Sequence, residues 1–242
     1  MYAVETSYLT KKYGELVAVD SLNLKIREGE LFSLLGVNGA GKTTAVKMLS
    51  LLTEPTEGEI SFFGENVVLN KLGAKRNVAL SPQETAVATN LSVWENLDFV
   101  CGIYGFGKAV REKKILDVSA KLGLDTVLQR RAGKLSGGWQ RRLSIAMALI
   151  SEPRILFLDE PTLGLDVLAR SELWEIIRAL KGKVTVILTT HYMEESEALS
   201  DRIGVMNNGR LLTIGTPREL MDKTGTCKVE DAFLRIVKEV QL

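Results

Sequence analysis

The stretch Gly36–Thr43, with the sequence GVNGAGKT, constrains the fold more than any other part of the chain. It fits the pattern G-x-x-x-x-G-K-[ST], in which glycines let the backbone wrap closely around a phosphate group with N–H groups pointing inward. The continuous apolar run Leu31–Leu35 comes directly before it, and Thr43–Leu52 follows with helical spacing. We therefore predict a buried strand, a phosphate-binding loop and a helix whose N-terminus adds a favourable dipole for the anion.

The residues of this loop have expected roles in holding a nucleoside triphosphate. The Lys42 ammonium is expected to reach the β- and γ-phosphates, and the Thr43 hydroxyl to ligate Mg²⁺. The remaining residues expected to contact the nucleotide are Gly36, Asn38, Gly39, Ala40, Gly41 and Thr44. The motif alone does not distinguish kinases, GTPases and transport ATPases.

Other apolar runs alternate with helical patterns along the chain. Ile155–Leu158, Val184–Leu188 and Ile203–Met206 have the continuous apolar character of strands buried on both faces of a parallel sheet. Helical patterns at Asp166–Lys181 and Met193–Leu199 lie between them. This alternation predicts an α/β core with a mainly parallel sheet.

Two regions depart from this alternation. From Val4 to Ile26 apolar and polar residues alternate around a turn-like Tyr-Gly-Glu, which predicts an antiparallel β subdomain at the N-terminus. From about Gln83 to Ile150 the pattern is helical throughout, which predicts an inserted all-helical subdomain. We expect one domain, with core and β lobe over 1–82 and 151–225, a helical subdomain over 83–150, and a C-terminal helix within 226–242 that includes Val229–Val240.

Composition and charge exclude several classes of function. The 31 basic residues nearly balance the 30 acidic residues, so no strong field attracts nucleic acid or anionic lipid. Cys101 and Cys227 match no metal or redox spacing and are expected to be reduced thiols of a cytosolic protein. No apolar run approaches the roughly 20 residues of a spanning helix, and Met1–Thr10 lacks the pattern of a secretory signal. If the chain acts at a membrane, another polypeptide is expected to hold it there.

Two adjacent carboxylates, Asp159 and Glu160, follow one of the predicted buried strands. Taken alone, the pair is compatible with a solvated strand end. Together with the phosphate loop it favours a catalytic site, in which Asp159 holds Mg²⁺ and Glu160 orients or deprotonates the attacking water. Because consecutive strand residues point to opposite faces, both can face the nucleotide only if the chain turns just after Asp159, and the following Pro161 is compatible with such a turn.

The chain has a single histidine, His191, which lies just beyond a predicted strand. Open α/β sheets place ligands at the carboxyl ends of their strands. A neutral imidazole there could hydrogen-bond the γ-phosphate or the attacking water. We therefore predict a role for His191 in the site.

The stretch Leu135–Arg142, with the sequence LSGGWQRR, resembles the signature motif of the ABC ATPases. By itself Ser136-Gly137-Gly138 is a loop followed by a helix start. In that family it would offer free N–H groups at a second helix end to the γ-phosphate of a nucleotide held by another subunit. Trp139 stands where many family members have glutamine, which leaves the fine geometry of this helix open.

The resemblance runs from about Val4 to Glu219 and implies further roles. Tyr13 matches the aromatic residue that stacks on adenine, and Gln83 the glutamine that senses Mg²⁺ and couples to the membrane partner. Asp166 lies in the stretch that resembles the loop crossing the dimer interface, and His191 falls at the position of the switch histidine. The catalytic residues implied are Glu160, His191 and Gln83, and the Mg²⁺ ligands are Thr43, Gln83 and Asp159.

The function implied is that of an ATP-binding and ATP-hydrolysing subunit of an ABC transporter that works with Mg²⁺. Its partners would be a transmembrane permease subunit, met through a groove near Thr85–Val93, and a second ATPase subunit, identical or not, at the cytoplasmic face of the membrane. The stretch Gln83–Tyr104 resembles the type-2 exporters, which include drug-efflux pumps.

Three alternatives stay open at this level. One is a soluble mechanochemical ABC ATPase of the kind that serves iron–sulfur cluster assembly. A second is a GTPase or small-molecule kinase, although Asn70-Lys71 continues as Leu72-Gly73 and does not complete the guanine-specifying Asn-Lys-x-Asp. The third is a binding module without hydrolysis. The transported substrate is chosen by the membrane subunit and leaves no mark in this chain.

Overall fold

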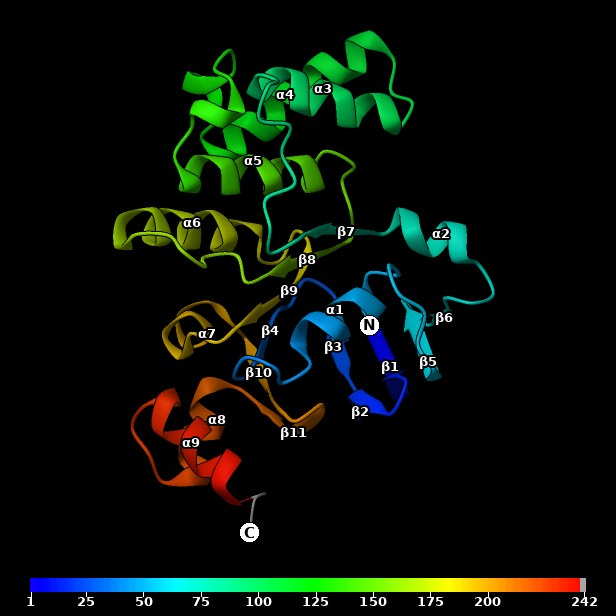
Figure 1. Ribbon diagram of the computed structural model, residues 1–242, viewed down its shortest axis with the longest axis vertical. Helices are drawn as coiled ribbons and strands as arrows, with labels where there is room; N and C mark the ends of the chain where they lie inside the picture. Colours follow the sequence, from blue (N-terminus) through cyan, green and yellow to red (C-terminus); the bar gives the residue numbers. More distant parts are fainter. Residues whose placement is uncertain (240–242) are drawn as a thin grey trace.

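The computed structural model describes residues 1–239 and contains two sheets with helices packed around them (Figure 1). The larger sheet has the strand order β11-β10-β4-β9-β8-β7, and every neighbouring pair is parallel except β10 and β11. Its strands are β4 (Leu31–Leu35), β7 (Val78–Ser81), β8 (Ile155–Asp159), β9 (Thr185–Thr190), β10 (Arg202–Asn207) and β11 (Arg210–Gly215). The mainly parallel sheet expected from the apolar runs is confirmed.

The second sheet is antiparallel and forms the N-terminal lobe. It has the order β2-β1-β5-β6, and β3 also pairs with β1. Its strands are β1 (Tyr2–Tyr13), β2 (Leu16–Leu22), β3 (Lys25–Arg27), β5 (Glu57–Phe62) and β6 (Glu65–Asn66). The first three fall in the predicted antiparallel stretch, whereas β5 and β6 were not predicted from the sequence.

The helices form three groups in Figure 1. Against the large sheet lie α1 (Lys42–Leu49), α6 (Val167–Leu180) and α7 (Met193–Leu199). The helical subdomain at the top of the view consists of α3 (Val93–Ile103), α4 (Lys108–Leu122) and α5 (Gly137–Leu149), with short 3-10 turns at Asp125–Val127 and Ala132–Lys134. The remaining helices are α2 (Lys71–Arg76), α8 (Pro217–Thr224) and α9 (Val229–Glu239). The sequence had not indicated α2 and α8, and Val240 of the predicted tail helix lies outside the described residues.

The strands of the large sheet are continuously apolar in sequence because both faces of this sheet are buried. Leu156 and Leu158 of β8 point into the core shared with the helical subdomain, whereas Ile155 and Phe157 point into the core beneath the antiparallel lobe. All four side chains are fully buried. Burying side chains of this size on both faces contributes roughly 1.5–3 kcal/mol for each, which fixes the position of β8 in the sheet.

The register of the central strands brings three chain segments to one edge of the sheet. Leu35 at the end of β4 pairs with Thr190, and Asp159 at the end of β8 pairs with Thr189. The loop after β4, the segment after β8 and the segment after β9 therefore leave the sheet side by side. This edge contains the phosphate-loop motif, the carboxylate pair and the histidine.

Along residues 1–239, none of the helices combines the length and the apolar character that crossing a membrane would need.

Candidate nucleotide-binding site

The loop between β4 and α1 requires glycine at positions where the backbone approaches its neighbours closely. Gly41 has φ 96°, in the left-handed region, and a Cβ there would lie 2.5 Å from the carbonyl oxygen of Ala18. A Cβ at Gly36 would lie 2.5 Å from the carbonyl oxygen of Met206. The loop is thus packed tightly against the antiparallel lobe and β10, and α1 begins directly after it at Lys42.

A cavity of about 710 Å³ lies over this loop. One wall is mostly apolar and comes from the antiparallel lobe, and the opposite wall carries the polar groups of the sheet edge. The lining residues are Leu16, Val17, Ala18, Asn38, Gly39, Ala40, Gly41, Lys42, Thr43, Thr44, Gln83, Glu160, Leu163, His191, Asn208 and Gly209. The predicted loop residues from Asn38 to Thr44 therefore share this cavity with Gln83, Glu160 and His191, and the sequence had not indicated the lining residues of the lobe.

Lys42 is the buried cation of the site, with its side chain 5% exposed. Its Nζ donates hydrogen bonds to the carbonyl oxygens of Gly36 at 2.7 Å and Val37 at 3.2 Å. The same atom lies 3.2 Å from Oε1 of Glu160. The ammonium is therefore held over the loop by three oxygen atoms.

Glu160 lies between Lys42 and His191. Its second carboxylate oxygen, Oε2, is 2.8 Å from Nδ1 of His191, and its side chain is 7% exposed. The backbone of Glu160 is left-handed, with φ 47°, and its N–H donates to Oγ1 of Thr189 at 3.0 Å. This bend is the turn after Asp159 that the sequence analysis required. A left-handed non-glycine residue is uncommon and costs on the order of 1 kcal/mol, so the surrounding structure holds it in place.

Asp159 faces the phosphate loop and the end of β9. Its Oδ1 accepts hydrogen bonds from Oγ1 of Thr43 at 3.2 Å and Oγ1 of Thr189 at 2.5 Å. Hydroxyl and carboxylate oxygens are ligands that Mg²⁺ prefers, and Mg²⁺ usually takes one or two carboxylates while phosphates and water complete its shell. Thr43, Asp159 and the cavity-lining Gln83 fit this chemistry. Accordingly, residues 1–239 contain no group of three or more His, Cys, Asp or Glu side chains that would hold a metal by themselves.

Arg141 of α5 is a buried residue of the site that the sequence analysis had not indicated. Its guanidinium donates to the carbonyl oxygens of Pro161 at 2.9 Å, of Asp159 at 2.7 Å and of Gln83 at 3.3 Å, and also to that of Pro82. Burial lowers the pKa of Arg141 to about 10, although Asp159, Glu195 and Glu160 raise it, so the side chain stays charged at neutral pH. It links α5 to the segments that carry Gln83 and Glu160. The sequence signal that could have indicated Arg141 is its spacing, because it lies one turn before the fully buried Ile145 and therefore on the buried face of α5.

Several predicted residues lie outside the cavity lining. Ser136 caps α5 by position but makes no side-chain capping hydrogen bond, so Gly137 and Gly138 follow it at an open helix end. Asp166 lies before α6, and its side chain accepts a hydrogen bond from the N–H of Ala169 at 2.9 Å. Tyr13 lies at the end of β1 and is half exposed. The roles of these residues toward a nucleotide stay predictions.

Trp139 follows the signature glycines in the first turn of α5 and is partly buried. It packs against the core shared by the sheet and the helical subdomain, and the Arg142 guanidinium lies 5.0 Å from its ring centroid. The side chain is thus anchored on the helical subdomain, away from the cavity lining.

The parallel sheet, the phosphate loop with Lys42 at the start of α1, and the carboxylates at the end of β8 together define a P-loop nucleoside-triphosphate-binding protein. The family model described as "ABC transporter" matches residues 19–163. The chain belongs to the ABC transporter family.

Named relatives support this assignment. The chain is 38% identical over 98% of its length to the probable multidrug ABC transporter ATP-binding protein YbhF of Escherichia coli K12, but it spans only 42% of that protein. It is 41% identical over 96% of its length to Nod factor export ATP-binding protein I of Rhizobium sp. strain N33 and spans 76% of it. A solved structure described as the ATP binding subunit of an ABC transporter superposes with a TM-score of 0.85 at 26% identity, covering 97% of this chain and 99% of the other.

Proposed function

We propose that the chain binds and hydrolyses ATP as a subunit of an ABC transporter. The observation that carries this proposal is the line of three side chains in the cavity, in which Glu160 contacts Lys42 through one carboxylate oxygen and His191 through the other. An ATP γ-phosphate at the loop would attract Lys42, because an ammonium binds phosphate as strongly as carboxylate. Oε1 of Glu160 would then be free to accept the proton of the attacking water.

His191 has a complementary role in this proposal. With one ring nitrogen 2.8 Å from Glu160, the ring has a fixed orientation at the rim of the cavity. If Nδ1–H donates to Glu160, Nε2 of a neutral ring would accept a hydrogen bond from the attacking water, and Nε2 would donate to the γ-phosphate only when both ring nitrogens carry a proton. Thr43, Asp159 and Gln83 would hold Mg²⁺, which neutralises charge on the phosphates when bound.

A second ATPase subunit completes the site in this proposal. Ser136 and Asp166 do not line the cavity of their own chain, and the side chains beside Asp166 are exposed apolar residues, with Val167 77% and Leu168 76% exposed. Exposed apolar side chains of this kind are expected at an interface. A γ-phosphate held by the loop of one subunit and the Ser136 helix end of the other would close the dimer, and its hydrolysis would open it.

The membrane partner is proposed to bind at a groove of about 510 Å³ between the α/β core and the helical subdomain. Its rim includes Leu52 and Tyr104, which are 66% and 49% exposed, and its wall includes Pro82 and Ala86. Ala86 falls within the stretch expected from the sequence to face the permease. The relatives' names, multidrug transporter and Nod factor export, favour export as the direction of transport. The chain would then lie at the cytoplasmic face of the membrane.

The test is Mg²⁺-dependent ATP turnover of the wild type and of Glu160→Gln. Removing a general base typically costs 10²- to 10⁴-fold, so we expect kcat to fall about 1,000-fold while ATP binding is retained. Glu152→Gln, which changes an exposed carboxylate paired with Lys114, is the matched control and should turn over ATP normally. Wild-type turnover in Glu160→Gln would remove Glu160 from the mechanism. Purification with a detergent-solubilised permease supports the transporter assignment, and a complex free of membrane protein supports the mechanochemical alternative.

A further inference from the structure

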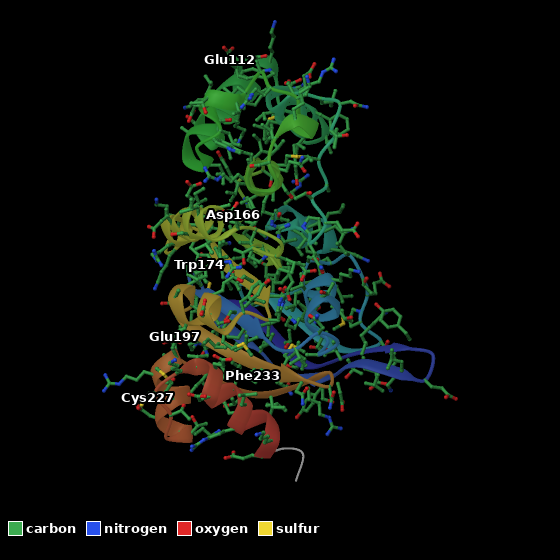
Figure 2. The ribbon with its side chains drawn as sticks, turned by 60° about the vertical axis from the view of Figure 1, so that its left-hand side comes forward. Glu112, Asp166, Trp174, Glu197, Cys227 and Phe233 are labelled. Carbon is green, nitrogen blue, oxygen red and sulfur yellow. The ribbon has the colours of Figure 1, made fainter. Side chains whose placement is uncertain are left out.

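A completely buried carboxylate, Glu195, lies behind the His191 segment on the first turn of α7. Its Oε1 accepts a hydrogen bond from Nε1 of Trp174 at 3.1 Å. Trp174 belongs to α6, the helix that begins directly after Asp166. Figure 2 shows Asp166 and Trp174 together on this layer, below the helical subdomain that carries Glu112. The hydrogen bond therefore joins the helix of the proposed dimer loop to the helix that follows the histidine.

A second contact joins the same two segments closer to the histidine. The guanidinium of Arg170, one turn after Asp166, lies 4.8 Å from the ring centroid of Tyr192. The Tyr192 ring lies in turn 4.1 Å from the His191 ring, tilted by 40°. Position and orientation of His191 thus depend on α6 at two points, Arg170 and Trp174.

Several polar atoms around Glu195 have no hydrogen-bond partner of good geometry among the described residues. They are Oε2 of Glu195, Oγ1 of Thr162 and Nε of Arg170, and all three are buried. Thr162 lies two residues after Glu160 and, with Thr190, lies close enough to the Glu195 carboxyl to influence it. Buried polar atoms without partners are rare in folded proteins. Two of these atoms, Oε2 of Glu195 and Oγ1 of Thr162, belong to neighbouring side chains, so the segments after β8 and β9 meet at the Glu195 carboxyl.

A carboxyl group is a poor choice for packing alone at this position. Burial raises the pKa of Glu195, and the nearby Glu160 also raises it, whereas the neighbouring hydroxyls of Thr190 and Thr162 and the hydrogen bond from Trp174 lower it. A leucine of similar size would fill the same space without a buried polar group. A carboxyl group can accept from Trp174 through one oxygen and interact with the hydroxyls of Thr162 and Thr190, which a leucine cannot do.

We propose that Glu195 is a positioning residue that couples the Asp166 loop to His191. When a second subunit moves the Asp166 loop, α6 moves with it, and the Trp174–Glu195 bond transmits this shift to α7 and to the histidine at the cavity. The hydroxyls of Thr162 and Thr190, which also act on the Glu195 carboxyl, connect it to the segments that follow β8 and β9. This inference rests on the proposed ATPase function and adds a route by which dimer closure reaches the γ-phosphate side of the site.

The test compares Glu195→Leu, Glu195→Gln and Trp174→Phe in Mg²⁺-dependent ATPase assays. We expect Glu195→Leu to lower kcat about tenfold with little change in KM, a size within the usual range for coupling between sites. Glutamine keeps an acceptor and a donor, so Glu195→Gln should restore most of the activity. Trp174→Phe keeps a smaller aromatic ring and removes the Nε1–H donor, so it should resemble Glu195→Leu, and the double variant should be no worse than Glu195→Leu alone.

The control is Ser196→Ala on the same helix, which removes the buried hydroxyl contact with Ser33 at 3.0 Å. It should lower thermal stability without changing the ratio of kcat to KM. The inference is overturned if Glu195→Leu and Trp174→Phe keep the wild-type kcat. It is also overturned if Ser196→Ala, at a similar loss of stability, lowers kcat as much as these two variants do. If the wild type itself has no ATPase activity, the proposed function is wrong. This outcome differs from an active wild type whose Glu195 and Trp174 variants are equally active, which would overturn only the role of Glu195.

Discussion

The proposed nucleotide site has two halves, which are the cavity over the phosphate loop and the N-terminal ends of α5 and α6. A single chain assembles the cavity, whereas the helix ends would act on a nucleotide bound by another subunit. In the cavity, Lys42 and His191 each lie within hydrogen-bonding distance of Glu160 in a single copy. At the helix ends, Ser136 has no capping bond and the Asp166 loop is flanked by exposed apolar side chains. The sheet edge therefore assembles the proposed phosphate site within one chain, whereas the proposed contact between the helix ends and a nucleotide requires a second subunit. Mutations should affect the two halves differently.

The largest effect is expected from Lys42→Ala, which removes the only buried cation of the cavity lining. Truncating one member of a buried charge pair costs about 2–5 kcal/mol, so the affinity for ATP should fall about 100-fold in the isolated chain. Lys47→Ala, on the exposed side of the same helix, is the control. Titration calorimetry with ATP measures both. Unchanged ATP affinity of Lys42→Ala would overturn the assignment of the phosphate loop.

A smaller effect, of a different kind, is expected from Ser136→Ala. Because Ser136 does not line the cavity, ATP binding by a single chain should be unchanged, while kcat should fall about tenfold through loss of one charge-assisted hydrogen bond of about 1.5 kcal/mol. Ser151→Ala, just past the other end of α5, is the control. Light scattering of ATP-loaded Glu160→Gln with and without Ser136→Ala tests dimer formation. If the Glu160→Gln protein stays monomeric with ATP and its membrane partner, the two-copy site is wrong.

The smallest expected effect is a pH dependence of stability from Glu195. Its pKa is raised in the folded protein by burial, so folding favours the protonated form, and this stabilisation is lost as the pH rises above the usual value of 4.5 and through the folded pKa. Each pKa unit corresponds to about 1.4 kcal/mol. The charged groups that act on Glu195 are Arg141 of α5 and Glu160.

Replacement by glutamine removes this titration. Urea denaturation of wild type and Glu195→Gln between about pH 5 and pH 8 should show the wild type losing stability relative to the variant as the pH rises. A constant difference between the two proteins over this range would show that Glu195 is ionised in both states.

The strands and the loop around the cavity could be predicted from the sequence because their signals are local. The runs that became β4, β8 and β9 are apolar on both faces, and the loop between β4 and α1 matches a motif with few alternatives. In contrast, β5 buries only Ile60 and Phe62 and was too weak a pattern to be recognised.

Arg141 and Glu195 could not be assigned from the sequence for a physical reason. The partners of Arg141 are backbone carbonyls from segments about 20 and about 60 residues away in the chain, and backbone atoms leave no compositional signal. Glu195 is one glutamate among several in an acidic stretch, and only the tertiary fold shows that it is the one that turns inward against Trp174.

Arg141 also has a mechanical consequence. A guanidinium is planar, and its N–H directions are fixed relative to one another, unlike the rotatable ammonium of lysine. Its bonds to Pro82 and Gln83 on one side and to Asp159 and Pro161 on the other connect the wall of the groove to the backbone on both sides of Glu160, the proposed general base. In the proposed mechanism, a displacement of the groove wall would therefore also displace Glu160, and a displacement of Glu160 would reach the groove.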